Sequence, residues 1–502
     1  MLKNRSLRAS TTLCALIAGL VGNGQSSDQW YGGYDSDSPY PYGGNSTLFN
    51  ANETAVSDTV DRAMWVSSTV TMATGPQEAI IAYTNGIYIA NTIDEPMDNG
   101  TGLNPSFYTS DVEIFGLRLP SSHHLLRIPE SESLLALFHL TVDTTDQNGT
   151  FVASHLYHSL IDLTQDGGNG AVILKNHVLL DGVFSRSGVA SVRHANGRDW
   201  WVFFHENLSN VFIRFLLTPS GVSGPWYQPI GSVRLGGSPV ISFTMAGDKA
   251  LMIDAFADLD IFDFDRCTGE LVNWRHADID DGEIFRYAAF SPSGRFAYVT
   301  SVTRIYQYDL LASDLETSMD TVAEWDGSYD SFPQFSNVFV EASLAADGKI
   351  YISTGNSTRY LHIIEQPDSL GLACNVVQHE HNRITFTDNS ICYPPNYALG
   401  PVDGSICDSL GINAGLPERS SPLRLSAYPN PNRGTFTLNY EPQAEPGMLE
   451  IREVSGKLLL QEGIPPWSSV HVAILSDIAP GLFDARIHWR RSTGSVRIMI
   501  QP

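Results

Sequence analysis

A sequence pattern that recurs about every fifty residues constrains the fold of this chain more than any other feature. Each copy holds a short alternating apolar run, a glycine-centred turn and a second alternating run, and the clearest copy covers residues 288–299. A glycine in such a turn supplies the positive φ that a tight hairpin requires. The turn glycines of the four best copies are Gly197, Gly247, Gly294 and Gly348. Two more strand-like runs follow each hairpin, as at residues 304–310 and 320–325, so each copy predicts four short strands.

Four-stranded units with this period are typical of the blades of a β-propeller. Weaker copies precede the clear ones and turn at residues 75–76 and 129–130. We therefore expect an all-β fold in which residues 67–385 form a propeller of six blades. Residues 25–66, rich in Gly, Ser, Tyr and Asn, are expected to form an arm, and a strand from this arm would add a seventh blade. A stacked β-solenoid is the alternative, although its period is usually shorter.

The first 24 residues show the three parts of a secretory signal peptide. A head with three basic residues and no acid precedes an apolar stretch at residues 13–21, and small residues follow at 22–24. The stretch of about nine apolar residues is well short of the roughly 20 that span a bilayer. A lipoprotein signal with Cys14 as the lipidated residue is the alternative. However, Cys14 lies at the start of the apolar stretch and lacks the small residue expected before a lipidated cysteine. We expect a cleaved signal, an exported chain, and no transmembrane segment in the mature protein.

The charge of the chain argues against one large class of partners. Fifty-five acidic residues against 30 basic ones give a formal net charge of −25 at pH 7. Such a surface repels the phosphate backbone of nucleic acids. We therefore expect no nucleic-acid partner, and the balance suits a soluble extracellular protein.

Four cysteines remain after removal of the signal, and an even number in an oxidising compartment predicts disulfides. Of the three pairings, we favour Cys392–Cys407 as a local staple and Cys267–Cys374 as a bridge between neighbouring blades. A zinc site is the alternative, but no CxxC spacing supports it. The surrounding residues 386–420 are rich in Pro, Gly and Asn and predict a stapled loop and a linker.

Residues 421–502 differ in character from the repeats. Short alternating runs separated by turns predict about seven strands in about eighty residues, which is typical of a small β-sandwich. The turns of this module are marked by Tyr428, Pro429, Asn430, Pro431, Gly434, Gly456 and Gly481.

The order, spacing and terminal position of these turn residues closely resemble the type A C-terminal sorting domain of the type IX secretion system of Bacteroidota. Phe483 stands where that family usually has a tyrosine. The resemblance implies that this module directs passage across the outer membrane through the type IX machinery. It also implies that the module is commonly removed on arrival, and that the cargo is released or attached to surface lipopolysaccharide.

The body of the chain is similar to uncharacterised secreted propeller proteins that carry the same tail. The residues that carry this likeness include the segments 83–88, 194–201, 264–269, 306–310 and 347–351. That family has no established activity, so the resemblance implies an architecture and an extracellular or cell-surface location only.

One candidate binding site lies at a single predicted turn. Its mixed polar groups and aromatic neighbour suit a sugar or a small anion, and its residues are His194, Asn196, Arg198, Asp199 and Trp200. A structural role is the alternative. In that case Asn196 makes the turn, the charged side chains pair with neighbouring loops, and the tryptophan packs between blades.

Two weaker candidates concern metal ions. His379 and His381 are two residues apart, so a strand would place both imidazoles on one face. Asp278 and Asp280 belong to an acidic run that offers oxygen ligands to calcium, but the spacing is not that of an EF-hand. Solvated side chains are the structural alternative in both cases. We expect no cofactor, with calcium as the alternative.

The function that we favour is binding of a glycan, peptide or partner protein by propeller loops held on a rigid ring. No nucleophile motif, GxGxxG loop or phosphate-binding P-loop occurs in a supportive setting, so we assign no catalytic residue. An extracellular hydrolase or lyase acting at the propeller axis is one alternative, and a structural component of the cell envelope is another. Acids or histidines converging at the axis would favour the enzyme, and a plugged axis would count against it.

Overall fold

The computed structural model describes residues 28–49, 55–68, 70–75, 80–254, 258–330, 334–387, 391–407, 425–453, 457–475, 478–489 and 493–501. The predicted signal peptide and Gly456 lie outside these residues. Strands dominate the described part of the chain, whose helical elements are α1 (Phe107–Asp111), η2 (Asp166–Gly168), η3 (Glu316–Ser318) and η4 (Gly371–Cys374). None of these helices has the length and apolar character needed to cross a membrane.

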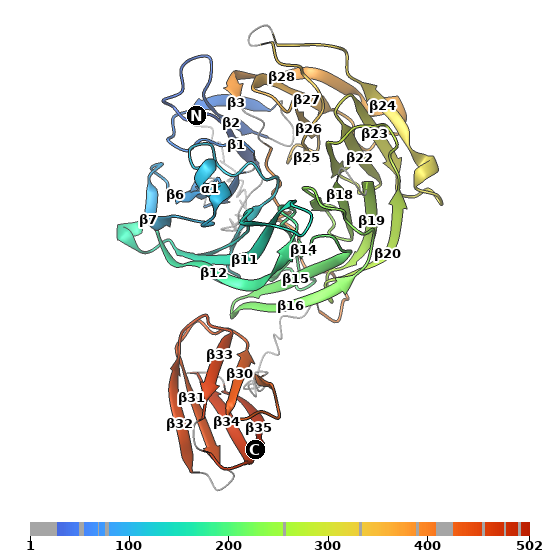
Figure 1. Cartoon of the computed structure of the whole chain (residues 1–502). Helices are drawn as coiled ribbons and strands as arrows, with labels where there is room; N and C mark the ends of the chain where they lie inside the picture. Colours follow the sequence, from blue (N-terminus) through green and yellow to red (C-terminus); the bar gives the residue numbers. More distant parts are fainter. Residues whose placement is uncertain are drawn as a thin grey trace, which may run out of the picture.

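Six blades of four main strands surround a central axis, which confirms the predicted all-β propeller (Figure 1). The strands of the first three blades are β4 (Thr71–Thr74), β5 (Ile80–Thr84), β6 (Tyr88–Ala90) and β7 (Pro96–Thr101); β8 (His123–Arg127), β9 (Leu134–His139), β11 (Phe151–Asp162) and β12 (Ala171–Phe184), with β10 (Thr144–Thr145) on β11; and β13 (Ala190–Arg193), β14 (Trp200–His205), β15 (Val211–Thr218) and β16 (Gly221–Pro229). The strands of the last three are β17 (Val240–Phe243), β18 (Lys249–Asp254), β19 (Asp258–Asp265) and β20 (Glu270–Ala277); β21 (Arg286–Phe290), β22 (Phe296–Ser301), β23 (Arg304–Asp309) and β24 (Asp320–Glu324); and β25 (Ala342–Leu344), β26 (Ile350–Ser353), β27 (Thr358–Ile364) and β28 (Val376–Thr387). The outer strands of the first two blades, β7 and β12, pair in parallel at Asp98 and Ala171 and so join these two blades into one sheet. Each predicted turn glycine lies between the first two strands of its blade at positive φ, as Gly294 does at 69°.

The N-terminal segment forms a seventh, three-stranded sheet rather than the extended arm that we expected. Its strands are β1 (Gln29–Gly33), β2 (Gly44–Leu48) and β3 (Val56–Val60), and it lies between the last and the first four-stranded blades (Figure 1). The pattern of apolar residues did not reveal this sheet, because the sheet buries polar side chains. These side chains form hydrogen bonds within the sheet and with the neighbouring strand β28. Asn45 donates to Thr385 Oγ1 over 2.6 Å, and Ser57 contacts both Thr47 (2.7 Å) and His381 Nε2 (2.7 Å).

Apolar clusters fill the space between neighbouring blades around the whole ring. One cluster joins the second and third blades and includes Phe138 and Trp200. The cluster that closes the ring is mixed in origin, since it combines Trp30 of the N-terminal sheet with Tyr83 of the first blade and Tyr351 of the last. Each sheet therefore buries both faces only when its two neighbours are present.

Residues 391–399, which follow the last blade, run through the centre of the ring, and we call them the axial segment. The axial segment lines two small cavities together with residues of the first strands β4, β8, β13, β17, β21 and β25, so the first strand of each blade lies next to the axis. Tyr393 and Tyr397 pack against the cores of the surrounding blades. Asn396 Nδ2 donates to Met245 O over 2.7 Å, at the side of the ring where the first strands end. Polypeptide therefore fills the axis.

The cysteine pairing that we favoured is wrong. Cys267, in the turn between β19 and β20, is joined to Cys407, with the two Cα atoms 5.6 Å apart. Cys374 and Cys392 are buried free thiols. The axial segment explains the difference, because it carries the chain across the ring and delivers Cys407 to the side where Cys267 lies. Cys392 stays near the axis, 3.9 Å from Tyr31 O.

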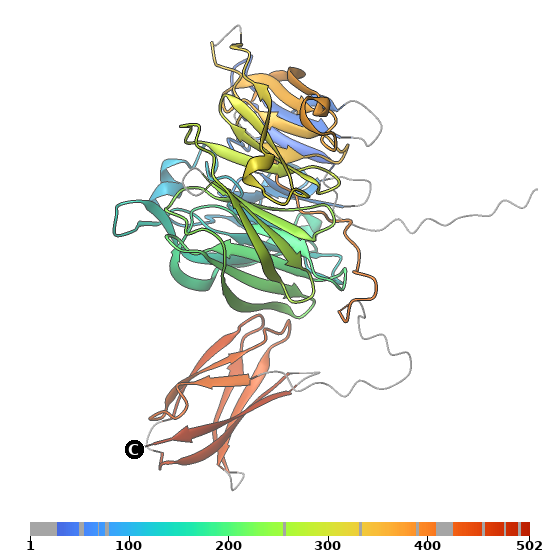
Figure 2. The same ribbon diagram turned by 90° about the vertical axis from the view of Figure 1, so that its right-hand side faces the viewer.

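The C-terminal residues form a β-sandwich of a three-stranded and a four-stranded sheet, drawn in red in Figures 1 and 2. The sheets contain β29 (Leu425–Tyr428), β30 (Thr435–Tyr440) and β33 (Val470–Ile474), and β31 (Gly447–Glu453), β32 (Leu458–Ile464), β34 (Gly481–His488) and β35 (Thr493–Ile500). Phe436, Leu449, Ile487 and Trp489 belong to its own apolar core. The sandwich thus buries a core that is separate from those of the blades.

The disulfide should stabilise the propeller by holding the axial segment in place. Its two cysteines are 140 residues apart, and a cross-link that closes so long a loop stabilises a fold by about 2–4 kcal/mol. We expect Cys407→Ser to lower the free energy of unfolding by this amount in urea titrations without reductant. With dithiothreitol present, wild type and variant should unfold alike. Equal stability of the two proteins under oxidising conditions would contradict the role assigned to the bond.

Candidate functional site

A cavity of 760 Å³ opens on the face of the propeller where the first strands of the six four-stranded blades begin. We call it the axial funnel. Its lining comes mainly from the loops that lead into β4, β8, β13, β17, β21 and β25, with further residues from α1, from the loop after β9, and from the starts of β11 and β21. The lining residues are Ser67, Ser68, Tyr108, Arg118, Leu119, Pro120, Val142, Phe151, Arg186, Gly237, Ser238, Ile284, Phe285, Arg286, Tyr287 and Glu341. Because every four-stranded blade contributes, the funnel exists only when the ring is closed.

The floor of the funnel is formed by buried polar groups above the axial segment. Tyr287 of the funnel and Tyr393 of the axial segment pack against the same apolar cluster. Burial raises the pKa of both phenols, and the charge of the nearby Glu341 raises them further. Glu341 is 1% exposed, and Ser68 Oγ donates to its Oε1 over 3.4 Å. The floor therefore carries the neutral phenol of Tyr287 beside the carboxyl group of Glu341, and the phenol of Tyr393 lies near both.

Three arginines line the wall, and their surroundings differ. Arg286 is buried and paired with Asp258 and with Asp281, whose Oδ1 lies 2.7 Å away. Arg186 donates from Nε to Ser238 Oγ over 2.8 Å and forms no ion pair with any described residue. Arg118 is exposed, with its guanidinium carbon 4.9 Å from the ring centre of Phe115. The wall thus combines one neutralised arginine with two that face the cavity.

The rim of the funnel is apolar. Ile284 and Phe285 are 60% and 58% exposed at the entrance to β21. Phe151 contacts Phe107 with ring centres 5.8 Å apart, and both rings are 47% exposed. Large apolar side chains exposed around a cavity with polar groups at its base are typical of ligand-binding sites.

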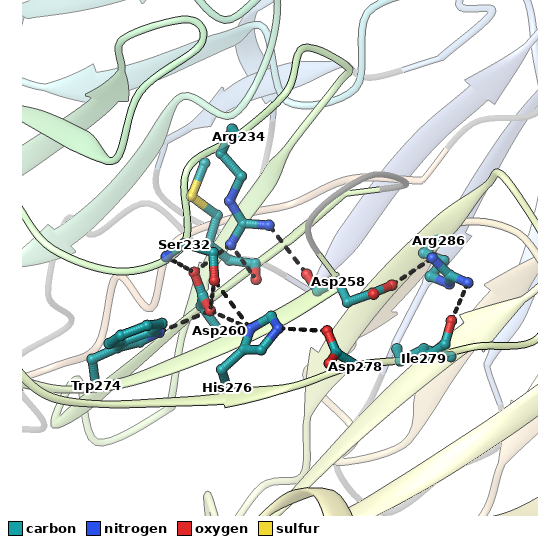
Figure 3. Close-up of polar contacts among 10 residues, drawn as sticks. Ser232, Arg234, Asp258, Asp260, Trp274, His276, Asp278, Ile279 and Arg286 are labelled. Carbon is teal, nitrogen blue, oxygen red and sulfur yellow. Dashed lines mark hydrogen bonds and ion pairs between the residues drawn. The ribbon is translucent and has the colours of Figure 1, made fainter.

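A buried charge network supports the loop that carries Gly237 and Ser238 into the funnel (Figure 3). Asp260 on β19 is its centre and is 1% exposed. Its carboxylate accepts hydrogen bonds from Ser232 (N, 2.8 Å; Oγ, 2.9 Å), Arg234 Nη2 (2.7 Å), Trp274 Nε1 (2.8 Å) and His276 Nδ1 (2.8 Å). Arg234 also pairs with Asp254 at 3.4 Å. Buried charges are tolerated when paired in this way, so the network fixes the loop to the blade.

The hydrogen bond between Asp260 and His276 shifts the pKa values of the two groups in opposite directions. Burial alone would raise the pKa of Asp260, but the hydrogen bond from His276 and the charge of Arg234 outweigh it and lower that pKa. The hydrogen bond to Asp260 raises the pKa of His276 to about 9, with Asp278 adding a second bond of 2.9 Å. His276 is therefore an imidazolium ion at neutral pH.

The predicted turn site lies on the opposite face from the funnel, between β13 and β14. Its residues bond mainly to one another: Asn196 Nδ2 donates to Asp199 Oδ2 (2.8 Å), and Arg198 pairs with Asp199 (2.7 Å) and with Glu130 (2.8 Å). His194 Nε2 contacts Cys267 O at 3.1 Å, and Trp200 is 1% exposed. This turn also contacts the chain that leaves the axis, since Val402 N donates to Ala195 O over 2.8 Å. These contacts match the structural alternative given above.

The predicted metal candidates are separated by the fold. His379 contacts Asp326 at 2.9 Å, whereas His381 contacts Ser57 at 2.7 Å on another sheet. Register shifts between β27 and β28 break the alternation that would have aligned them. Asp278 binds His276, and Asp280 is exposed. The part of the chain that the structure describes holds no cluster of three or more His, Cys, Asp or Glu side chains arranged for a metal ion.

The motif of the C-terminal module folds as a turn clamped to the last strand. Asn430 Nδ2 donates to Arg497 O over 2.8 Å, and Met499 N donates to Asn430 Oδ1 over 2.8 Å. Gly434 has φ 98°, and a Cβ there would lie 2.6 Å from Leu475 O. Tyr428 is 75% exposed, and residues 429–431 are exposed beside it. Gly481 begins β34. The motif therefore combines a structural clamp with an exposed surface.

No family model and no curated protein matches this chain. Solved structures resemble it in fold. A Bacteroides fragilis protein provisionally assigned as a 6-phosphogluconolactonase is 11% identical, with a TM-score of 0.44 over 74% of this chain and 98% of that one. A gluconolactonase of Xanthomonas campestris (11%, TM-score 0.29, 58% and 84% covered) and a Bacteroides thetaiotaomicron protein of unknown function (11%, 0.30, 74% and 88%) are similar in the same way. Likeness at this level carries no inference about activity.

None of the residues singled out from sequence lines the funnel. Its lining residues are scattered from Ser67 to Glu341, with no shared motif. The one signal in the sequence was the position of these residues within the repeat. Most lining residues lie in or near a loop that leads into the first strand of a blade. That signal needs correct blade boundaries, which a sequence gives poorly.

The raised pKa of His276 predicts a pH-dependent stability. The folded state holds this proton up to about pH 9, whereas an unfolded histidine releases it near 6.5. The contribution of His276 is therefore complete below pH 6.5 and is lost as the pH rises through about 9. We expect the free energy of unfolding to fall over this interval.

The variant His276→Gln should flatten this fall, because glutamine can bond to Asp260 but does not titrate here. His488→Gln in the C-terminal sandwich is the matched control, since His488 is 44% exposed. Urea titrations at several pH values between 6 and 10 measure the effect. Equal pH slopes for wild type and His276→Gln would show that the network does not hold the proton.

Proposed function

We propose that this chain is an exported binding protein whose axial funnel holds a small extracellular ligand, either a glycan or a short peptide. The observation that carries the proposal is the funnel itself: a 760 Å³ cavity with an apolar rim and a polar base, built by loops of six blades. Cavities of roughly 300–1,000 Å³ with this distribution of polar groups are typical of small-ligand sites.

The side chains that line the funnel at the axis support binding over catalysis. The described lining contains one carboxyl group, at Glu341, and no histidine. Hydrolysis of a glycosidic bond generally uses two carboxylates that face each other across the bond. The axial segment fills the centre of the ring below the floor, so the funnel is a closed-ended site. These features suit retention of a ligand by shape and hydrogen bonds.

The funnel can be tested by removing one rim side chain. Phe285→Ala should leave stability almost unchanged, because the ring is 58% exposed, but should weaken binding of funnel ligands about tenfold. Leu311→Ala is the matched control, since Leu311 is 73% exposed beyond β23 on the opposite face. The signal-cleaved full chain would be screened on arrays of oligosaccharides and peptides, and hits measured by calorimetry. Hits that bind both variants equally, or a screen without hits, would refute a funnel ligand.

We further propose that residues 421–502 act as a type IX sorting domain and that the propeller is delivered to the cell surface or the medium. The exposed Tyr428 to Pro431 surface offers a recognition site that does not belong to the sandwich core. The Cys267–Cys407 bond lies before the linker to this module, so removal of the module would leave the axial segment fastened. A propeller freed in this way would keep its funnel.

The export route predicts a change of location when the module is missing. In the native host, the full chain should reach the surface or medium and lose the mass of residues 421–502, whereas the chain truncated after residue 420 should stay in the periplasm. Tyr428→Ala should impair export, and Val472→Ala, at another exposed position of the same sandwich, should not. If truncation leaves the location unchanged, the module is not a sorting signal.

A further inference from the structure

We propose that the ligand of the axial funnel is a short acidic saccharide and that Arg186 binds its carboxylate or sulfate group. This inference rests on the proposed function, because it names the ligand class of the same site. It depends on three features of the funnel: a lining that is less acidic than the rest of the molecule, the guanidinium of Arg186 that faces the cavity, and the combination of rings and hydroxyls around it.

The funnel is less acidic than the molecule as a whole. The chain carries a formal net charge of −25, whereas the funnel lining holds three arginines and one glutamate, and only Arg286 among these arginines is paired with two aspartates. A strongly acidic protein repels anions over most of its surface, so a wall with an arginine that forms no ion pair with a described residue is the more favourable place for an anion. A low-dielectric cavity strengthens such an interaction relative to open water.

The comparison between Arg286 and Arg186 shows which arginine is available. Arg286 is neutralised by Asp258 and Asp281, and it bonds to the backbone as well. Arg186 has one described hydrogen bond, from Nε to Ser238, which orients the guanidinium. Its two terminal nitrogens have no described partner. This is the geometry in which a guanidinium binds an oxyanion through two parallel hydrogen bonds.

Arg186 lines the funnel together with Tyr108, Tyr287 and Ser238. Its charge acts on Tyr287 at the floor and on Tyr108 at the wall, lowering the pKa of each phenol against the effect of burial. The Arg118 amide also bonds to the Tyr108 hydroxyl, and the Arg118 side chain lines the same cavity. Two cationic side chains therefore flank one tyrosine.

The rest of the lining favours a saccharide as the carrier of the anionic group. Aromatic side chains offer flat apolar faces with polar edges, and four of the lining residues are aromatic: Tyr108, Phe151, Phe285 and Tyr287. Three serine hydroxyls, from Ser67, Ser68 and Ser238, can both donate and accept hydrogen bonds, as sugar hydroxyls do. A cavity of 760 Å³ suits a ligand of a few rings.

The test measures binding of defined probes to the signal-cleaved full chain by calorimetry at low and moderate salt. The probes are a trigalacturonate, a neutral galactose trisaccharide, a triglutamate peptide, inorganic phosphate and inorganic sulfate. We expect the trigalacturonate to bind at least about tenfold more tightly than the neutral trisaccharide and the peptide, and to weaken as salt rises.

The variant Arg186→Gln should weaken trigalacturonate binding about tenfold or more, because it removes charge-assisted hydrogen bonds. Arg186→Lys should restore part of the lost affinity, since lysine keeps the charge but lacks the planar guanidinium that forms two parallel hydrogen bonds. Arg295→Gln is the matched control, because Arg295 is an exposed arginine that pairs with Asp309 at 2.7 Å on the opposite face. The unfolding midpoint of each variant shows whether it is folded.

The outcomes separate this inference from the proposed function. If acidic and neutral trisaccharides bind equally and Arg186→Gln changes neither, the anionic inference is overturned while a funnel ligand stands. Preference for the triglutamate peptide, or for free phosphate or sulfate, overturns the saccharide. If no probe binds, the acidic-saccharide inference fails. The array screen with Phe285→Ala still tests separately whether the funnel binds any ligand.

Discussion

Closure of the ring is the constraint on which the rest of this structure depends. A four-stranded blade has two apolar faces, and it buries both only between two neighbours. The junction of the last and first blades is where the ring must close, and here it is filled by segments that precede and follow the four-stranded blades. The N-terminal sheet supplies Trp30 and Phe49 to that junction, and the axial segment adds Ile391 and Cys392. The disulfide at Cys407 then holds the axial segment across the centre.

The funnel follows from this closure. Its wall is made of loops that enter the innermost strands, and its floor stands above Tyr393 of the axial segment. Charged groups in and behind the wall fall into two kinds. Arg234 and Arg286 are buried and satisfied by aspartates, so they fix loops in place. Arg186 lies at the cavity, bonded to one serine. An ion pair within the protein neutralises a charge that could otherwise bind a ligand. This difference therefore separates the structural arginines Arg234 and Arg286 from Arg186.

The sequence predicted the parts of the fold that depend on neighbouring residues. Gly197, Gly247, Gly294 and Gly348 occupy the hairpin turns at positive φ, as their spacing indicated. It failed where polar residues replaced apolar periodicity, as in the N-terminal sheet with its buried Asn45 and Ser46. It also failed where a bulge broke alternation, so that His379 and His381 reach different partners. The candidate turn at His194 to Trp200 was found because its residues are contiguous, which the funnel residues are not.

The amino-acid sequence by itself determined the repeat, the all-β class, the six main blades and the separate C-terminal sandwich, because turns and alternating strands depend on residues close together in the chain. Only the tertiary structure decided the seventh sheet, the path of the axial segment, the Cys267–Cys407 pairing and the funnel. Each of these depends on which segments, more than a hundred residues apart in the chain, meet around the axis. Ring closure makes that choice, and no local pattern of residues encodes the distance between one blade and another.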